Sequence, residues 1–188
     1  MPIFSNLLPK PEILDAMPLH EGPSNAQSTY VALTTLDGGS YVIRKPIRFN
    51  RCLVRLTAAT SAPTLAMSIY QAADGGGAAT ANRVATMSAV GVTATTITLT
   101  VDEGTVLLKP GIIHVLYGRA SGSGTFTTRT YLNVALDLLN QNVDSGSHKI
   151  TFTTALAASG VHPTTLAPLT DCTASILDVA PIIRFKKV

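Results

Sequence analysis

Apolar and polar side chains alternate with a period of two along most of the chain after residue 28. In TTITLTV, residues 95–101, Ile97, Leu99 and Val101 share one face and threonines occupy the other, which is typical of a half-buried strand. The same alternation predicts further strands around Leu65, Met67 and Ile69; Ile113, Val115 and Tyr117; Ile150 and Phe152; and Ile183 and Phe185.

Turn-forming residues separate these predicted strands. They occur as DGG at 37–39, DGGG at 74–77, DEG at 102–104, KPG at 109–111, SGSG at 121–124 and DSGS at 144–147. Many short strands at this spacing, without intervening helical patterns, predict an all-β fold, an antiparallel β-sandwich. Helical spacing occurs only over residues 132–140, a stretch that fits a buried strand followed by a loop equally well.

One predicted strand changes phase partway along its length. In IRFNRCLVRL the apolar positions are Ile47 and Phe49, and then Cys52, Val54 and Leu56. A slip of this kind, near residues 50–51, predicts a bulge or bend, the device by which a long strand passes from one sheet of a sandwich to the other.

The first 27 residues differ from the rest and form a predicted extended arm, followed by one domain over residues 28–188. Five of the eleven prolines fall in the arm, which excludes a long helix or a central strand. The arm is nevertheless too apolar for a solvated tail. Its apolar side chains include Ile3, Phe4, Leu7, Leu8, Ile13, Leu14 and Met17. Two interpretations remain open: the arm covers a sheet edge of its own domain, or it clasps a neighbouring subunit.

Charge is scarce and unevenly placed. Only 13% of residues are charged, against about a quarter in an average soluble domain, so much of the surface is expected to face other protein. The net charge of +3 conceals one cluster without acids, which consists of Arg44, Lys45, Arg48, Arg51 and Arg55. The cluster indicates either an anionic partner or the outward side of a long strand, paired with Glu12, Asp15 or Glu21 of the same or a neighbouring chain. No aromatic residues that could stack on bases interleave these cations, so we do not expect a nucleic-acid partner.

Motifs that carry chemistry are lacking in the sequence. The four histidines, His20, His114, His148 and His162, have no spacing that aims two of them at one metal ion. No GxSxG, P-loop, GxGxxG or calcium-loop pattern occurs. Cys52 and Cys172 fit two small buried side chains better than a disulfide. We therefore expect a protein that is not an enzyme and has no cofactor or metal site.

A carbohydrate-binding loop is the main non-catalytic alternative. Sugar sites use aromatic rings beside amide and acidic groups on rigidly held loops, which nominates Tyr70, Gln71 and Asp74, or Tyr117 and Arg119. Against this interpretation, the sequence has no Trp and only 5% aromatic residues.

The order of segments resembles the β-sandwich domains of tailed-bacteriophage virion proteins. The resemblance covers roughly residues 41–187. It is carried by RFNRCLVRLTAATSAPTLAMSIYQAADGGG, a Thr-rich strand, VLLKPGIIHVLYGRASG, SGVHPTTLAPL and a closing APIIRF. In that family a strand ending in IY precedes an acid-glycine tip, and an L-x-P-G turn introduces the next core strand. The aromatic residue usual after that turn is replaced here by Ile112 and Ile113.

The resemblance implies a jelly-roll-like sandwich that assembles as a homo-oligomer, commonly a trimer. It implies a structural protein of the virion: a capsid decoration or cement protein that binds neighbouring virion proteins, such as the major capsid or tail protein. The alternative is a tail, baseplate or fibre-tip component that binds host carbohydrate. Assembly would take place in the host cytoplasm, because the N-terminus does not read as a signal peptide and the uncharged windows at 84–101 and 150–170 do not read as membrane spans.

Overall fold

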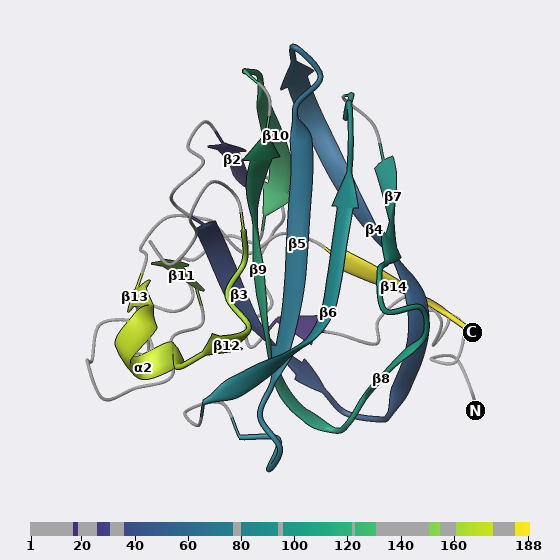
Figure 1. The fold of residues 1–188 in the computed structure, drawn as a ribbon, viewed down its shortest axis with the longest axis vertical. Helices are drawn as coiled ribbons and strands as arrows, with labels where there is room; N and C mark the ends of the chain where they lie inside the picture. Colours follow the sequence, from purple (N-terminus) through teal and green to yellow (C-terminus); the bar gives the residue numbers. More distant parts are fainter. Residues whose placement is uncertain are drawn as a thin grey trace, which may run out of the picture.

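The chain forms an all-β structure in which one continuous sheet curls around an apolar interior (Figure 1). The coordinates are a computed structural model. The structure describes residues 17–18, 26–30, 36–76, 80–93, 96–121, 123–130, 151–154, 161–174 and 183–188. The predicted all-β class is therefore confirmed.

The regular elements of the described residues are mostly short strands. They are β1 Met17–Pro18, β2 Ala26–Tyr30, β3 Leu36–Ile43, β4 Ile47–Thr60, β5 Thr64–Gln71, β6 Ala81–Ala89, β7 Thr96–Val101, β8 Val106–Leu108, β9 Gly111–Ser121, β10 Thr125–Thr130, β11 Thr151–Thr154, β12 Thr165–Leu166, β13 Thr173–Ala174 and β14 Ile183–Lys187, together with the short helix α2 Pro168–Asp171.

Every strand pairing in the described part of the chain is antiparallel. The sheet runs in the order β13-β11-β3-β9-β5-β6-β7-β4-β10-β2. Outside this path, β1 pairs with β3, β12 pairs with β6, and both β8 and β14 pair with β4. Strand β4 therefore joins four other strands along its length.

The inner face of the curled sheet holds the main core. Leu65, Met67 and Ile69 of β5 are buried there, as are Ile183 and Phe185 of β14. The predicted faces of the β7 and β9 strands are confirmed in the same way: these strands bury Leu99, Val101, Ile113, Val115 and Tyr117 in this core, and Ile97 packs against it. Burial of one such aliphatic side chain stabilises the fold by roughly 1.5–3 kcal/mol.

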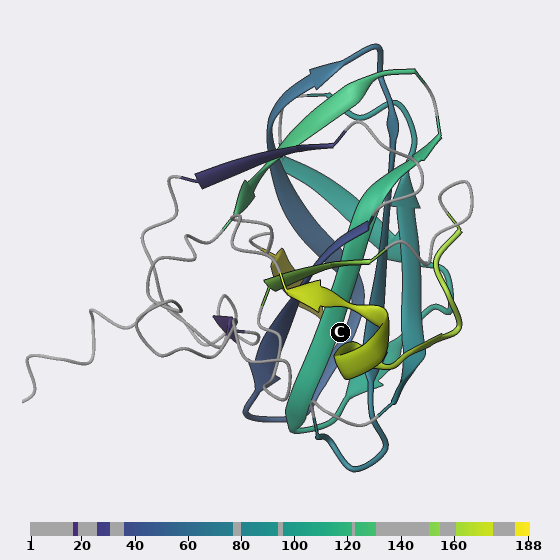
Figure 2. The same ribbon diagram turned by 90° about the vertical axis from the view of Figure 1, so that its left-hand side faces the viewer.

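A second, smaller cluster lies on the outer side of the sheet. Tyr70 of β5 and Leu116 of β9 pack there against Leu166 and Cys172. The last two belong to residues 161–174, which we call the covering segment; it carries β12 and α2 and lies across the outside of the sheet in front of β9 (Figure 2). Both cysteines are buried and free, one in each cluster, as the sequence predicts.

The predicted bulge in β4 is confirmed. The pairing of β14 with β4 shifts between Lys186 and Lys187, whose partners are Arg51 and Phe49, so Asn50 has no partner in that ladder. Burial changes phase at the same point, because Ile47 and Phe49 are buried before the bulge and Cys52, Val54 and Leu56 after it. A second shift, opposite β10, leaves out Thr57. The bulges bend β4, which then contacts different strands at its two ends.

One turn prediction is wrong and another is confirmed. The DGG at 37–39 is wrong as a turn, because Asp37, Gly38 and Gly39 lie inside β3 and pair with β9 on one side and β11 on the other. Pairing on both sides outweighs the local preference of Asp and Gly for turns. The DEG at 102–104 is a turn between two strands, as predicted. It does not reverse the chain, since β7 before it and β8 after it both run along β4 in the same direction.

The other predicted turns differ in how far the structure describes them. The DGGG turn contacts the start of β9, where Ile112 N–H donates to the Gly75 carbonyl at 2.9 Å. A Cβ on Gly111, whose φ is +134°, would lie 2.5 Å from that carbonyl oxygen, so only glycine fits there. The DSGS at 144–147 and the helical spacing at 132–140 lie outside the described residues.

Two short pieces of the predicted arm are described. Met17 and Pro18 pair with Val42 and Tyr41 of β3, and residues 26–27 belong to β2, which pairs with β10. These pieces therefore contact sheet edges of the same chain. Ile3, Phe4, Leu7, Leu8, Ile13 and Leu14 lie outside the described residues.

Candidate functional site

The clearest candidate site is a cationic surface on the outer side of β4. Arg48, Arg51 and Arg55 project from this strand and are exposed, because their neighbours in the alternation point into the core. Arg44 and Lys45 are also exposed, in the connection between β3 and β4. The outward orientation that the sequence predicts for the strand residues of this cluster is confirmed.

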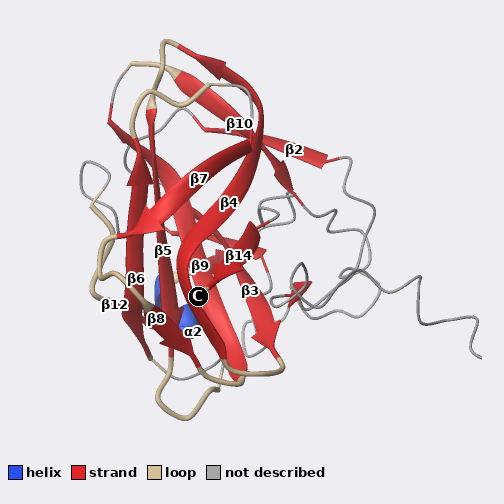
Figure 3. Ribbon diagram, turned by 90° about the vertical axis from the view of Figure 1, so that its right-hand side faces the viewer, coloured by secondary structure: helices blue, strands red, loops and turns tan. Residues whose placement is uncertain are grey.

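Neighbouring strands extend this surface on both sides (Figure 3). Arg51 lies between Thr100 of β7 and Lys186 of β14, and Leu53 lies between Thr98 and Arg184. We call the outward positions on these strands the basic face. They are Arg48, Arg51, Leu53 and Arg55 of β4; Thr96, Thr98 and Thr100 of β7; Leu107 of β8; Arg184 and Lys186 of β14; and the adjoining Val188.

The contribution of β14 to the basic face was missed from the sequence. Arg184 and Lys186 are exposed and alternate with the buried Ile183 and Phe185. The alternation in IRFKK already shows that these cations point away from the core, but only the pairing of β14 with β4 shows where they lie. The basic face thus brings together two cationic segments about 130 residues apart in the chain.

The basic face also has apolar positions but no aromatic ones. Leu107 is 53% exposed and Val188 is 68% exposed. They lie on either side of Arg48: Leu107 pairs with it, and the Val188 N–H donates to the Arg48 carbonyl at 3.1 Å. The aromatic residues of these strands, Phe49 and Phe185, instead contact each other inside the core, with ring centroids 4.6 Å apart.

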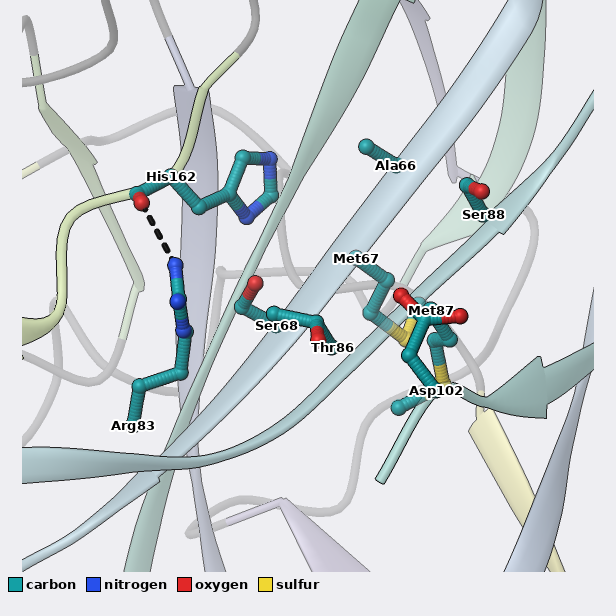
Figure 4. Close-up of a pocket in the computed structure, with 9 residues that line it drawn as sticks. All are labelled: Ala66, Met67, Ser68, Arg83, Thr86, Met87, Ser88, Asp102 and His162. Carbon is teal, nitrogen blue, oxygen red and sulfur yellow. Dashed lines mark hydrogen bonds between the residues drawn. The ribbon is translucent and has the colours of Figure 1, made fainter. Parts of the chain in front are cut away.

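A small hollow on the outer side of β5 and β6 is the second candidate (Figure 4). Its volume is about 120 Å³, enough for a few water molecules. Its lining residues are Ala66, Met67, Ser68, Arg83, Thr86, Met87, Ser88, Asp102 and His162. Polar groups from β5, β6 and the covering segment therefore meet at one place.

Hydrogen bonds to the backbone hold the covering segment beside this hollow. The Arg83 guanidinium donates to the His162 carbonyl at 2.7 Å and to the Pro163 carbonyl at 3.4 Å. The Tyr70 hydroxyl donates to the same Pro163 carbonyl at 2.7 Å. The backbone N–H of Arg83 also donates to the Thr164 carbonyl at 2.9 Å. Because these donors engage carbonyl groups of the chain, we interpret Arg83 as part of the scaffold.

His162 is the titratable group that the fold perturbs most clearly at the hollow. Its side chain is only 6% exposed, and neither ring nitrogen has a hydrogen-bond partner among the described residues. Burial, together with the charge of nearby Arg83, lowers the pKa of His162 to about 4. The imidazole is therefore neutral at pH 7.

On the β6 side of the hollow, Glu103 bonds to Thr86 in the middle of the strand. Its carboxylate accepts hydrogen bonds from the Thr86 N–H at 2.8 Å and the Thr86 hydroxyl at 2.6 Å. Partial burial works against ionisation of Glu103, but the bonds from Thr86, a bond from its own backbone N–H and the charge of Arg83 together lower the pKa of the carboxyl below its usual value. We interpret this carboxylate as fixing the turn between β7 and β8.

The structure corrects the carbohydrate-binding hypothesis at Tyr70. Its ring is fully buried under the covering segment, so it cannot stack on a sugar, and burial raises the pKa of its hydroxyl. Tyr117 is likewise buried, in the main core. Gln71 bonds to the backbone of Lys109, and Arg119 donates to the Gly124 carbonyl. Asp74 accepts from the Gly76 N–H at 2.8 Å in its exposed turn. The residues nominated for sugar binding therefore do not come together as one exposed surface.

His114, the other described histidine, lies inside the sheet. His114 Nδ1 and the Ser40 hydroxyl form a buried 2.8 Å hydrogen bond between β9 and β3. His20 and His148 lie outside the described residues. Among the residues that the structure describes, no group of three or more His, Cys, Asp or Glu side chains is placed to hold a metal ion. No helix in the described ranges is long and apolar enough to cross a membrane.

No protein-family model and no curated protein sequence matches the chain.

Proposed function

We propose that this chain is a non-enzymatic structural protein of a tailed-bacteriophage particle, a capsid decoration or cement protein that self-associates as a trimer and binds neighbouring virion proteins. The family resemblance of residues 41–187 supports this proposal, and an all-β curled sheet is compatible with it. In the proposal, the curled sheet is a jelly-roll-like sandwich.

One observation carries the proposal: the basic face is an exposed, cation-rich surface on a chain that has few charges. Arg48, Arg51 and Arg55 have no acidic residue opposite them on the paired strands. A soluble domain that works alone normally mixes both signs of charge over its surface. A surface this rich in cations favours binding to something outside the domain.

The arm supplies the second contact in this proposal. Residues 1–16 precede the first described strand, β1, so they can be deleted without removing the pairing of Met17 and Pro18 with β3. We expect the shortened chain to fold but to lose the trimer and to decorate particles poorly, because the arm clasps the neighbouring subunit.

The experiment compares the full chain with the chain lacking residues 1–16. Light scattering measures oligomer size, and co-sedimentation with virus particles from the same source measures decoration. Far-ultraviolet circular dichroism checks that the shortened chain keeps its strands. If the shortened chain forms the same oligomer and still decorates particles, the clasp is wrong. If the full chain fails to sediment with particles at all, the proposed function is wrong.

A further inference from the structure

We propose that the basic face binds an acidic protein surface, in which carboxylates are accompanied by apolar side chains. The inference rests on the proposed function and deepens it by naming the chemistry of the partner. Three features of the basic face support it: cations pair across β4 and β14, apolar residues lie between them, and the aromatic rings of these strands point inward.

Cations face each other across the two strands. Arg51 and Lys186 are directly opposite partners in the ladder, and both are exposed. Like charges in this arrangement destabilise a strand pair. A carboxylate placed between the two side chains would remove that repulsion and accept hydrogen bonds from both. The geometry therefore gives an anionic partner a place to bind.

The residues along β4 define a pattern for the partner. The outward positions of β4 are Arg48, Arg51, Leu53 and Arg55 in chain order. The bulge at Asn50 lets Arg48 point to the same side as the other three. Outward residues on one strand are about 6.8 Å apart. A complementary surface presents carboxylates opposite the three arginines and an apolar side chain opposite the leucine.

The apolar positions favour a protein partner over nucleic acid. Leu107 and Val188 are exposed on either side of Arg48, and Leu53 lies between the exposed Thr98 and Arg184. Protein interfaces combine apolar contacts with Arg, whereas interfaces with DNA are more polar and more strongly cationic. Single-stranded nucleic acid would need exposed rings for stacking, but Phe49 and Phe185 point into the core.

Three labelled probes distinguish the partner classes in fluorescence anisotropy titrations of the full chain at low salt. The first is the peptide Glu-Ser-Glu-Ser-Leu-Ser-Glu, which follows the β4 pattern. The second has Ser in place of Leu and the same charge. The third is a short DNA duplex. We expect the Leu-containing peptide to bind about tenfold more tightly than the Ser-containing peptide, and more tightly than the duplex.

Two variants that change the net charge by the same amount test whether the peptide binds on the basic face. Arg51→Gln removes one cation from the basic face, and Thr165→Glu adds one anion at an exposed position on β12, on the covering segment. Arg51→Gln should weaken binding of the Leu-containing peptide about tenfold, whereas Thr165→Glu should leave it within about twofold. Because Arg51→Gln also removes the repulsion with Lys186, its thermal midpoint should not fall, which excludes unfolding as the reason for lost binding.

Three results would overturn the inference. One is equal weakening by the two variants, which means that overall charge alone drives binding. Another is tighter binding of the duplex, which assigns the basic face to nucleic acid. The third is equal binding of the two peptides, which removes the apolar contribution. The particle assay separates this inference from the proposed function: if Arg51→Gln decorates particles as well as the parent chain, the partner binds elsewhere while the function stands.

Discussion

His162 should make the folded chain less stable as the pH falls from about 6.5 towards 4. The imidazole is buried under the covering segment beside Arg83, and neutral His is the form that the fold tolerates there. Protonation would place a second positive charge next to the guanidinium in a site with little water. In the unfolded chain the same imidazole is exposed and takes up a proton near pH 6.5.

The size of the effect follows from the two pKa values. The pKa of His162 falls from 6.5 to about 4 on folding. One pKa unit corresponds to about 1.4 kcal/mol, so the interval amounts to about 3 kcal/mol in the free energy of unfolding. Between the two values the unfolded chain binds more protons than the folded one, so stability rises with pH there. The contribution is complete above pH 6.5, and about 2 kcal/mol of it should be lost between pH 7 and pH 4.5.

Urea denaturation of the parent chain and of His162→Gln at pH 7, 5.5 and 4.5 measures this effect. Glutamine keeps a polar side chain but does not titrate, and all other ionisable groups are common to both proteins. The parent should therefore lose about 2 kcal/mol more than the variant between pH 7 and pH 4.5. Equal losses in the two proteins would refute the assignment of a neutral, buried imidazole at this position.

Two further predictions concern single contacts. Gly111→Ala should destabilise the fold by more than about 2 kcal/mol, because its Cβ would lie 2.5 Å from the Gly75 carbonyl oxygen. Gly104→Ala is the control: φ there is +82°, but the new Cβ would have no atom within 4 Å, so the loss of stability should be only about 1 kcal/mol. Thermal denaturation compares the two variants, and equal losses of stability would contradict the close approach at Gly111. Tyr70→Phe should lower the free energy of unfolding by about 1 kcal/mol, because it removes the 2.7 Å hydrogen bond to the Pro163 carbonyl. Urea denaturation measures this loss, and an unchanged midpoint would show that Arg83 holds the covering segment alone.

Local patterns allowed much of the fold to be predicted. Alternation is set by the geometry of a single strand, so the inward faces at Leu65, Met67 and Ile69 and the phase change around Asn50 could be recognised without knowing any pairing. The prediction of a turn at residues 37–39 was wrong because Gly38 and Gly39 pair with β9 on one side and β11 on the other. Which strands pair with these glycines cannot be read from residues 37–39 themselves.

Features that join distant segments could not be predicted in the same way. Tyr70 looked like a surface ring next to a glycine-rich tip, but the covering segment, 93 residues further along the chain, buries it and accepts its hydrogen bond. The basic cluster at 44–55 was recognised, yet its completion by Arg184 and Lys186 depends on the register between β4 and β14. A sequence pattern gives the face on which a residue lies, and tertiary pairing gives its neighbours.

The pairing of β14 with β4 imposes an order of events during synthesis. Phe49 and Cys52 emerge from the ribosome early. Phe185, which packs against the Phe49 ring and pairs with Cys52, follows more than 130 residues later. At 5–20 residues per second, this delay is on the order of ten seconds. During that time one side of β4 lacks its final neighbour, and an unpaired strand edge is the kind of surface on which nascent chains aggregate. Charged arginines along β4 would keep such chains apart, so the same residues can protect the polypeptide before it is finished and serve the folded protein afterwards.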